Sequence, residues 1–209
     1  MTRHPDTVKI DNPDGAGRDK GGPYHHGALR EALIDAAVSI IAERGVDGFS
    51  LREAARRAGV SPAAPQHHFG DVRGLLTAIA TAGFAELGDA LAAADAQGPQ
   101  DLPARLRRQG EAYVRFALRQ PARFDVMWRK TRIDPDDAAL RQAATRAYGF
   151  LKAAAGGDAQ DNEVRAVAAW SLVHGFARLA LDGALGSEPG AAARAADALL
   201  AGVMERLKD

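Results

Sequence analysis

The sequence predicts an all-α fold. Alanine is frequent, runs of β-branched residues are absent, and Gly or Pro occurs at the intervals expected between helices. No segment alternates apolar and polar residues as a half-buried strand would. The 46% hydrophobic fraction is sufficient for a core, and 26% of the residues are charged. A chain of 209 residues has room for one large domain or two small ones.

Composition excludes several kinds of site. The chain has no cysteine, which excludes disulfides, thiolate metal sites and cysteine nucleophiles and suits a reducing cytosol. We expect a cytoplasmic protein without a membrane span, because apolar stretches fall short of the ~20 residues required and no signal peptide opens the chain. Acidic and basic residues balance at 27 each. This neutrality does not itself favour a nucleic-acid partner.

Helix signals follow one another along most of the chain. Residues 1–23 mix Gly, Pro and alternating charges, which predicts a flexible tail. A first helix is expected from about Ala28 to Gly45, whose glycine suits a left-handed C-cap. Asp71 is expected to cap a fourth helix, and Asp134-Pro135 to start another. The remaining helices are expected at about 101–119, 121–130, 135–154, 162–184 and 190–207.

Residues 50–69 predict two short helices joined by a tight turn. Ser50 and Glu53 form a potential capping box at the start of the first of these helices. Gly59 would permit the turn, Ser61 would cap the next helix, and Pro62 would occupy its first position. This spacing is typical of a helix-turn-helix, although ordinary helical hairpins share it. The expected small core consists of Leu51, Ala54, Ala55, Ala58, Val60 and Phe69.

The order of residues in this region resembles the tetracycline-repressor (TetR) family of transcriptional regulators. The match runs without a gap from Tyr24 to Leu76. It rests on Tyr24-His25-His26-Gly27-Ala28-Leu29-Arg30, Ala42-Glu43-Arg44-Gly45, Phe49-Ser50-Leu51-Arg52-Glu53-Ala54-Ala55, Ala58-Gly59-Val60-Ser61-Pro62-Ala63-Ala64-Pro65, His68-Phe69-Gly70-Asp71 and Leu75-Leu76. Farther on, Trp170, His174 and Gly175 resemble the Trp-x-x-x-His-Gly signature of one C-terminal class in this family.

The resemblance implies a dimeric regulator with three DNA-binding helices and about six sensor helices. The implied divisions are a tail at 1–23, a DNA-binding domain at 24–72 and a ligand-sensing and dimerisation domain at 73–209. It further implies repression at a pseudo-palindromic double-stranded DNA operator, relieved by a small hydrophobic or amphipathic molecule. The third helix would enter the major groove. The implied DNA-binding residues are Ser50, Arg52, Ser61, Pro62, Ala63, Ala64, Gln66, His67 and His68.

Three positions depart from the family pattern. Gln66 stands where an aromatic residue is usual, His67 where arginine or tryptophan is common, and Val72 where a lysine usually grips phosphate. Gln66 can still read adenine through its amide. Loss of the lysine removes one counterion-releasing contact, which lowers affinity and salt dependence. An alternative is therefore a helical ligand- or protein-binding sensor with weak or lost DNA binding.

Aromatic residues in the second half predict a ligand pocket, although they fit an ordinary core equally well. The candidate pocket residues are Tyr113, Phe116, Met127, Trp128, Phe150, Trp170 and His174. His174 could instead be a buried histidine bonded to a backbone carbonyl, with Gly175 allowing close helix contact. Small residues on the last helix fit a dimer seam or an intramolecular contact. These candidate dimer residues are Ala195, Ala198, Leu199, Gly202 and Val203.

The sequence favours neither catalysis nor metal binding. Ser171 and His174 share a helix face, with Asp182 farther along, but nothing supplies an exposed nucleophile or an oxyanion hole. The adjacent His67 and His68 would point about 100° apart on a helix, which disfavours chelation of one ion. We therefore expect a non-enzymatic protein without metal or cofactor.

Overall fold

The chain is helical throughout the part that the structure describes. The computed structural model describes residues 23–98, 101–185, 200 and 202–203. Those residues contain eight named α-helices, a short 3₁₀ helix and no strand, which confirms the predicted fold class. The elements are α1 (Pro23–Arg44), η1 (Val46–Gly48), α2 (Leu51–Arg57), α3 (Ala64–Phe69), α4 (Val72–Asp95), α5 (Leu102–Arg119), α6 (Pro121–Met127), α7 (Ala138–Ala155) and α8 (Ala159–Leu181).

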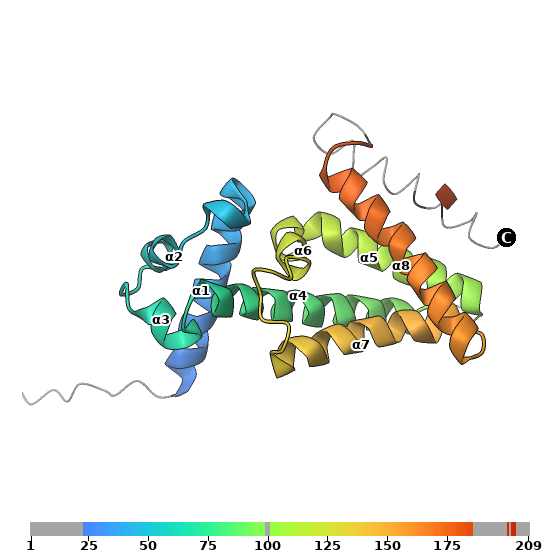
Figure 1. Cartoon of the computed structure of the whole chain (residues 1–209), viewed down its shortest axis with the longest axis horizontal. Helices are drawn as coiled ribbons and strands as arrows, with labels where there is room; N and C mark the ends of the chain where they lie inside the picture. Colours follow the sequence, from blue (N-terminus) through green and yellow to red (C-terminus); the bar gives the residue numbers. More distant parts are fainter. Residues whose placement is uncertain (1–22, 99–100, 186–199, 201, 204–209) are drawn as a thin grey trace, which may run out of the picture.

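The helices form two groups that α4 joins. Helices α1, α2 and α3 lie together at one end, and α4 runs from them into the second group (Figure 1). There α4 packs lengthwise against α7, α5 crosses both, and α8 packs against α5 and α7. The short α6 contacts both α1 and α4. The N-terminal group is therefore connected to the larger group by a continuous helix and by side contacts.

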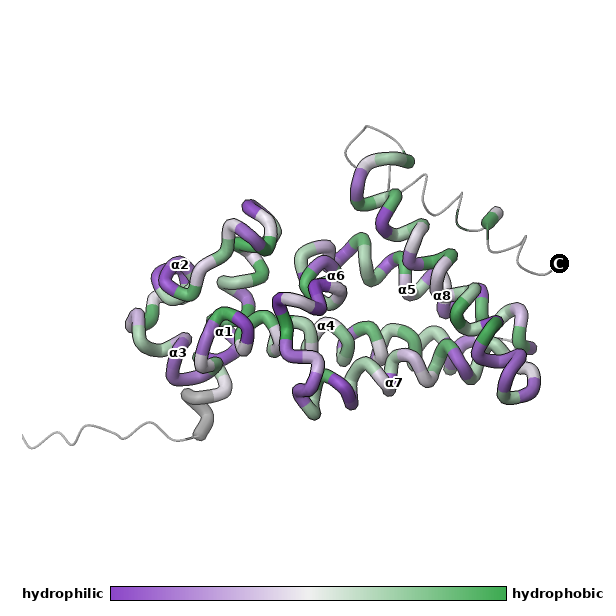
Figure 2. Tube along the Cα trace, viewed as in Figure 1, coloured by the Kyte–Doolittle hydropathy of each residue, from purple (hydrophilic) through white to green (hydrophobic). Residues whose placement is uncertain are grey.

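Helix α4 is apolar because it lies inside the fold. Its length and composition alone would suit a membrane span, but more than half of its most apolar window is buried against other helices. Figure 2 shows it as largely hydrophobic, whereas α2 and α3 carry hydrophilic segments. Its buried residues include Leu75, Leu76, Ile79, Gly83, Leu87 and Leu91, which lie at helical spacing. Other residues of α4, such as Ala80 and Phe84, are buried as well, so the helix contributes apolar surface to the core on more than one of its sides.

A continuous core links the two groups. It extends from Ile34 and Ile40 of α1, through Leu76 of α4, to Phe124 of α6 and Val173 of α8. Leu200, beyond the last named helix, is also buried in it. Burial of this connected apolar surface is the main term that holds the two groups together.

Helix α3 begins later than the sequence predicts. Its N-cap is Ala63, which makes no side-chain capping bond, rather than Ser61. Pro65 has no N–H to donate to the Ser61 carbonyl, so that carbonyl accepts from Ala64 in a single turn instead. The predicted end at Phe69–Gly70 is confirmed, and Gly70 adopts a φ of 76°.

Helix α7 also begins later than predicted. Asp137 caps it by accepting from the Leu140 amide at 2.8 Å, whereas Asp134 was the expected cap. The amide of Asp134 donates to the Thr77 hydroxyl of α4 at 2.8 Å. That tertiary bond holds residue 134 in a loop, and Asp137, whose carboxylate accepts from the Leu140 amide, starts the helix instead.

The other helix boundaries differ modestly. Helix α1 begins at Pro23 rather than near residue 28, because a proline suits the first helical position and the following residues have no breaker stronger than Gly27. Helix α6 ends at Met127 rather than 130, and α8 starts at Ala159, where Asp158 provides the cap. The predicted flexible tail is residues 1–23, of which residues 1–22 lie outside the described part of the chain. The predicted helix at 190–207 is described only at residues 200 and 202–203, which are helical.

Candidate DNA interface and ligand cavity

The turn between α2 and α3 is a Schellman motif. The Val60 amide donates to the Ala55 carbonyl and the Gly59 amide to the Arg56 carbonyl. Gly59 adopts a φ of 68°, which a glycine reaches without steric cost. Ala54 and Ala55 are fully buried, while Leu51 and Phe69 pack at the edge of the core. The turn predicted from the sequence therefore has a definite hydrogen-bonded geometry.

The predicted DNA-contacting edge lies on the surface. Seven of the nine predicted residues are exposed, and Ala64 and His68 are half-buried. The exposed ones are Ser50, Arg52, Ser61, Pro62, Ala63, Gln66 and His67. Val72, which replaces the expected lysine, is half-buried and packs against the core. In Figure 1, α2 and α3 lie at the end of the molecule away from α5, α7 and α8.

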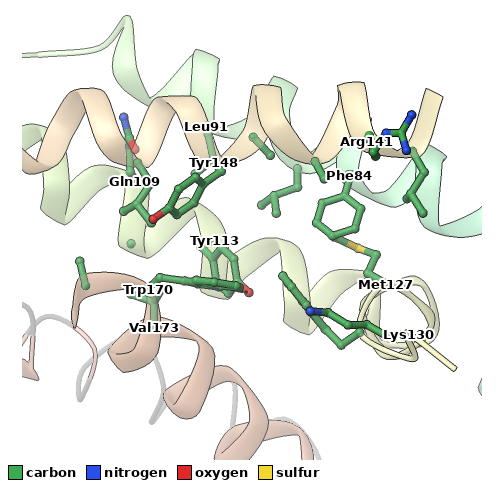
Figure 3. A pocket seen from close by; sticks show the side chains of 18 of the residues that line it. Phe84, Leu91, Gln109, Tyr113, Met127, Lys130, Arg141, Tyr148, Trp170 and Val173 are labelled. Atoms are coloured by element: carbon green, nitrogen blue, oxygen red, sulfur yellow. Dashed lines mark hydrogen bonds between the residues drawn. The ribbon is translucent and has the colours of Figure 1, made fainter. Parts of the chain in front are cut away.

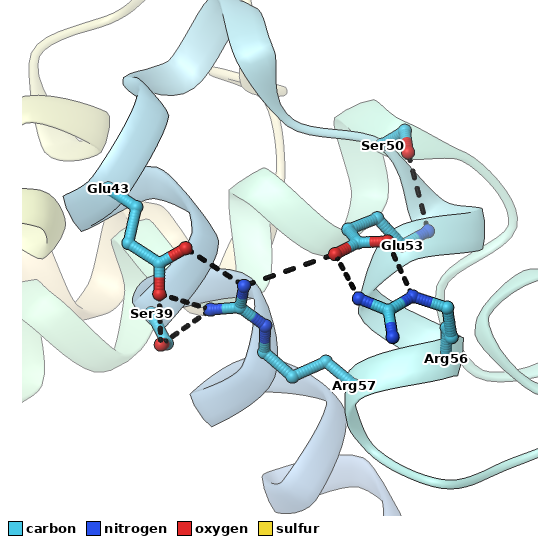
Figure 4. A network of polar contacts seen from close by, with 6 residues as sticks. All are labelled: Ser39, Glu43, Ser50, Glu53, Arg56 and Arg57. Carbon is cyan, nitrogen blue, oxygen red and sulfur yellow. Dashed lines mark hydrogen bonds and ion pairs between the residues drawn. The ribbon is translucent and has the colours of Figure 1, made fainter.

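Polar contacts hold α2 against α1 (Figure 4). Arg57 of α2 donates to both carboxylate oxygens of Glu43 in α1, at 2.6 and 2.9 Å, and to the Ser39 hydroxyl at 2.8 Å. The same contact lowers the pKa of Glu43, chiefly through the hydrogen bond from Arg57. These contacts fix the angle at which α2 and the following turn leave α1.

The predicted capping box forms only in part. Ser50 accepts from the Glu53 amide at 3.3 Å, as predicted. The Glu53 carboxylate instead binds the Arg56 guanidinium through two bonds of 2.7 and 2.9 Å. A guanidinium offers a better-matched pair of donors than one backbone amide. As a result, the charges of Arg56 and Arg57 are both paired within the group formed by α1, α2 and α3. No described carboxylate pairs with the exposed Arg52.

The larger helical group encloses an apolar cavity of about 380 Å³ (Figure 3). This volume lies within the range of ~300–1,000 Å³ that small-molecule sites occupy. Helices α4, α5, α7 and α8 and the segment 127–135 contribute its walls. The residues that line it are Phe84, Leu87, Leu91, Leu106, Gln109, Gly110, Tyr113, Met127, Trp128, Lys130, Ile133, Pro135, Leu140, Arg141, Ala144, Ala147, Tyr148, Leu151, Ala169, Trp170 and Val173.

The cavity includes four of the seven predicted pocket residues. Those four are Tyr113, Met127, Trp128 and Trp170. Phe116 is buried in the core instead, and Phe150 packs beneath the Arg146 guanidinium. The α4 and α7 walls carry no distinguishing signal in the sequence, because their apolar residues look like any core stripe. Lys130 and Arg141 likewise could not be assigned to the site from the sequence, since only the tertiary fold brings them to one cavity.

His174 lies behind the cavity wall rather than in it. Its Nδ1 is 2.9 Å from the Tyr113 hydroxyl, which is also 3.4 Å from the Trp170 Nε1. Because the indole N–H can only donate, the Tyr113 oxygen accepts from it, while the tautomer of His174 sets the direction of the bond between Nδ1 and the hydroxyl. Burial, and secondarily Arg178, lower the pKa of His174, and burial raises the pKa of Tyr113. Both shifts favour the neutral forms that this chain of hydrogen bonds requires.

The contacts of His174 correct one expectation. The histidine bonds a tyrosine hydroxyl, not a backbone carbonyl, because Tyr113 on α5 reaches it across the core. Nor does Gly175 provide a close approach to any described residue, since a methyl group built there meets nothing within 4 Å. Gly83 does provide a close approach between helices, since a methyl group there would lie 2.7 Å from the Met127 sulfur. Close packing of α4 against α6 therefore depends on Gly83.

The segment that follows α6 contacts both the cavity and the DNA-binding group. Its apolar side chains line the cavity, while Arg132 binds Asp47 of η1 at 2.9 Å and Arg129 approaches Asp47 at 4.0 Å. Arg123 of α6 also binds Asp35 of α1 and Glu86 of α4, at 3.4 and 2.6 Å. The segment therefore connects the cavity wall directly to η1 in the N-terminal group of helices.

Two of the five predicted dimer residues fall in the described part. Gly202 and Val203 are half-buried, and Val203 packs against the core of its own chain. Ala195, Ala198 and Leu199 lie outside the described residues. The dimer seam thus stays a prediction. No group of three or more His, Cys, Asp or Glu side chains in the described ranges is arranged to hold a metal ion.

Family models match both groups of helices. Residues 33–79 match the model described as bacterial regulatory proteins of the tetR family, and residues 106–203 match the tetracyclin repressor-like C-terminal domain. The chain belongs to the TetR family. Its helix-turn-helix and its helical C-terminal half are those of a transcriptional regulator rather than an enzyme, as the sequence predicts. The Trp-x-x-x-His-Gly assignment within the family stays a prediction.

Known proteins resemble this TetR-family regulator over different lengths. The HTH-type transcriptional regulator BetI of Rhizobium meliloti (strain 1021) is 36% identical over 90 residues, which are 43% of this chain and 42% of BetI. A protein of unknown function from Rhodococcus sp. RHA1 is 31% identical, with a TM-score of 0.72 over 90% of this chain and 97% of that one. A tetR-family regulatory protein from Rhodococcus RHA1 is 25% identical, with a TM-score of 0.64 over 82% and 95% of the two chains.

Proposed function

We propose that this TetR-family protein is a ligand-responsive repressor that binds a pseudo-palindromic operator as a dimer. A small hydrophobic or amphipathic molecule in the cavity would release it. The observation that carries this proposal is an exposed edge formed by Gln66 of α3 and by Pro62 and Ala63 just before it, next to the Schellman turn. An exposed helix of this kind fits the major groove of DNA.

Ligand response would follow from the position of segment 127–135. Its apolar residues form part of the cavity wall, and its arginines bind Asp47 beside the DNA-binding helices. A ligand that favours one arrangement of this segment would shift the population between DNA-binding and non-binding states. Two-fold symmetric dimers bind half-sites about one DNA turn apart, ~34–36 Å, so a small rotation of one module would break the match.

The experiment is a fluorescence-anisotropy titration of the protein against DNA upstream of its own gene, at stated low salt. We expect specific binding that exceeds binding to scrambled DNA by ~10³-fold or more. Gln66→Ala should weaken specific binding by roughly 1–3 kcal/mol and relax the preference at one base position. The matched control is Gln97→Ala, an exposed glutamine at the far end of α4.

Unchanged sequence preference in Gln66→Ala would show that this residue does not read bases. A monomer at micromolar concentration in sedimentation would contradict the dimer. Val72 favours the second candidate function, a sensor with weak DNA binding, because its side chain packs against the core and offers phosphate no charge. In that case specific and scrambled DNA would bind equally weakly, while the cavity would still bind ligand.

A further inference from the structure

We propose that the cavity binds an amphipathic anion, with an apolar body and a single carboxylate or comparable acidic group at the end marked by Lys130 and Arg141. The proposal rests on the proposed function, since it names the chemical class of the effector. It starts from the charges of the residues that line the cavity. Lys130 and Arg141 carry positive charge, and none of the lining residues is acidic.

The two cations lie at the same end of the cavity. In Figure 3, Lys130, Arg141, Phe84 and Met127 lie toward one end, and Gln109 toward the other. Lys130 follows α6, whereas Arg141 comes from the first turn of α7, so two separate segments place positive charge on opposite walls of the cavity toward this end (Figure 3). A carboxylate at this end would lie in the positive field of both side chains and could make a charge-assisted contact with either of them.

Lys130 is available for such a contact. No described acidic group pairs with it, and its side chain is exposed while still lining the cavity. Arg141 lies 3.4 Å from the Asp136 carboxylate, but Asp136 is 90% exposed. An ion pair exposed to this degree is weak, and a guanidinium has five N–H donors, so Arg141 can bind a second acceptor. A long lysine stem can lie along an apolar wall while its ammonium group stays hydrated.

The rest of the cavity suits an apolar body. Leu87, Leu91 and Ala147 line it with aliphatic carbon, and Trp128 and Trp170 add aromatic faces. A small cation is disfavoured, because it would meet two positive charges and no carboxylate on the lining. A fully polar anion is disfavoured too, because it would leave most of the apolar wall without a partner.

The two tryptophans of the chain make the test direct. Trp128 and Trp170 both line the cavity, and the chain has no other tryptophan. Selectively excited tryptophan fluorescence therefore reports on this cavity and requires no DNA. The probes are decanoate, decanol and decylamine, which share one chain length and differ in the charge of the head group. We expect saturable quenching, with decanoate tightest and decylamine weakest, and one decanoate bound per chain.

Variants locate the head group. Lys130→Gln should weaken decanoate binding about tenfold and leave decanol binding within a factor of two. Lys130→Arg should restore decanoate binding. The double variant Lys130→Gln, Arg141→Gln should bind decanoate more weakly than Lys130→Gln alone. These figures correspond to roughly one charge-assisted contact. The matched control is Arg107→Gln, which removes an exposed positive charge from α5 outside the cavity and should change neither affinity.

Two results would overturn the proposal. One is that decanoate has no advantage, because decanol or decylamine binds as tightly or because decanoate does not bind at all. The other is an equal loss of affinity in Lys130→Gln and Arg107→Gln, which would indicate general electrostatics. Decanoate that binds the cavity without changing DNA anisotropy would leave the ligand class standing and contradict the effector role in the proposed function. If DNA binding responds only to uncharged molecules, the effector role in the proposed function stands and the anionic ligand class is contradicted.

Discussion

At the scale of single residues, the partners of each arginine decide what that arginine can contribute. Arg57 is held by Glu43 and Arg56 by Glu53, so their charges serve the internal structure of the module. Arg52 is exposed at the start of α2, on the same surface as Ser50, and no described carboxylate pairs with it. The three arginines look equivalent in the sequence, but Arg52 is the one of the three that has no carboxylate partner among the described residues.

We therefore predict different salt dependences for two neighbouring variants. Arg52→Gln should weaken binding to specific and nonspecific DNA alike and reduce the slope of log K against log salt by ~0.9, the value for one phosphate contact. Arg56→Gln, whose charge is already paired with Glu53, is the control and should change the slope much less. DNA anisotropy titrations at several salt concentrations measure both slopes. An equal change in both slopes would show that the Glu53 pair does not withhold Arg56 from DNA.

At the scale of elements, a buried polar cluster fixes the junction between α4 and α5. Asp95 at the end of α4 accepts two bonds from Arg105, at 2.8 and 2.9 Å, and one from Gln109 at 3.0 Å. Gln109 is nearly inaccessible, and its Oε1 has no partner in the described structure. The hydrogen bonds from Arg105, then that from Gln109, lower the pKa of Asp95 against the opposing effect of burial.

This cluster predicts a pH-dependent contribution to stability. Because the pKa of Asp95 is lower in the folded state, its contribution is complete above its unfolded pKa, near 3.9, and is lost as the pH falls through the folded value. Asp95→Asn should therefore cost roughly 1–3 kcal/mol at pH 7 and progressively less below about pH 4. Urea unfolding across this pH range measures the difference. A difference independent of pH would indicate that the charge of Asp95 is not what stabilises the junction.

At the scale of the whole molecule, the two groups of helices share one core and several ion pairs. Arg123 is the most buried of the connecting cations, with its side chain 13% exposed between Asp35 of α1 and Glu86 of α4. Its Nε has no partner among the described residues, so the bonds to the two carboxylates carry most of its contacts. A shared core of this kind favours a single cooperative unfolding transition.

Calorimetry should show one transition for the wild-type protein. Arg123→Met should lower the free energy of unfolding by roughly 1–3 kcal/mol, because Glu86 loses its partner at 2.6 Å while the apolar stem is kept. Arg115→Met on exposed α5 surface is the comparison and should cost well under 1 kcal/mol. Two separate transitions in the wild-type protein would contradict a continuous core.

Much of the fold was predictable because its signals are local. Ser50, Asp71 and Gly59 act through backbone groups within a few residues, so the sequence correctly predicts the caps of α2 and α4 and the turn before α3. The predicted starts of α7 and α3 were wrong because a local capping rule competed with a distant hydrogen bond in one case and with a missing backbone N–H in the other. Thr77 holds Asp134 out of α7, and Pro65 removes the bond that would have let Ser61 start α3.

The candidate sites divide in the same way. The exposed edge of α3 belongs to one short stretch, so its residues could be named from the sequence, and the structure places most of them on the surface. The cavity gathers Phe84, Lys130, Arg141 and Trp170 from four segments, and no local pattern records that they meet. Phe116 and Phe150 show the limit of assigning cavity residues from the sequence. Their spacing resembles that of the true lining residues, but their neighbours in space differ.

By itself the sequence determined the helical class, the family and the helix-turn-helix, because helix periodicity, capping and turn chemistry act over distances of a few residues. Only the tertiary structure decided which apolar faces leave a cavity, which arginines are already neutralised, and where positive charge meets the cavity wall. The physical reason is that burial and ion pairing depend on neighbours in space. Those neighbours are set by packing of helices far apart in the chain.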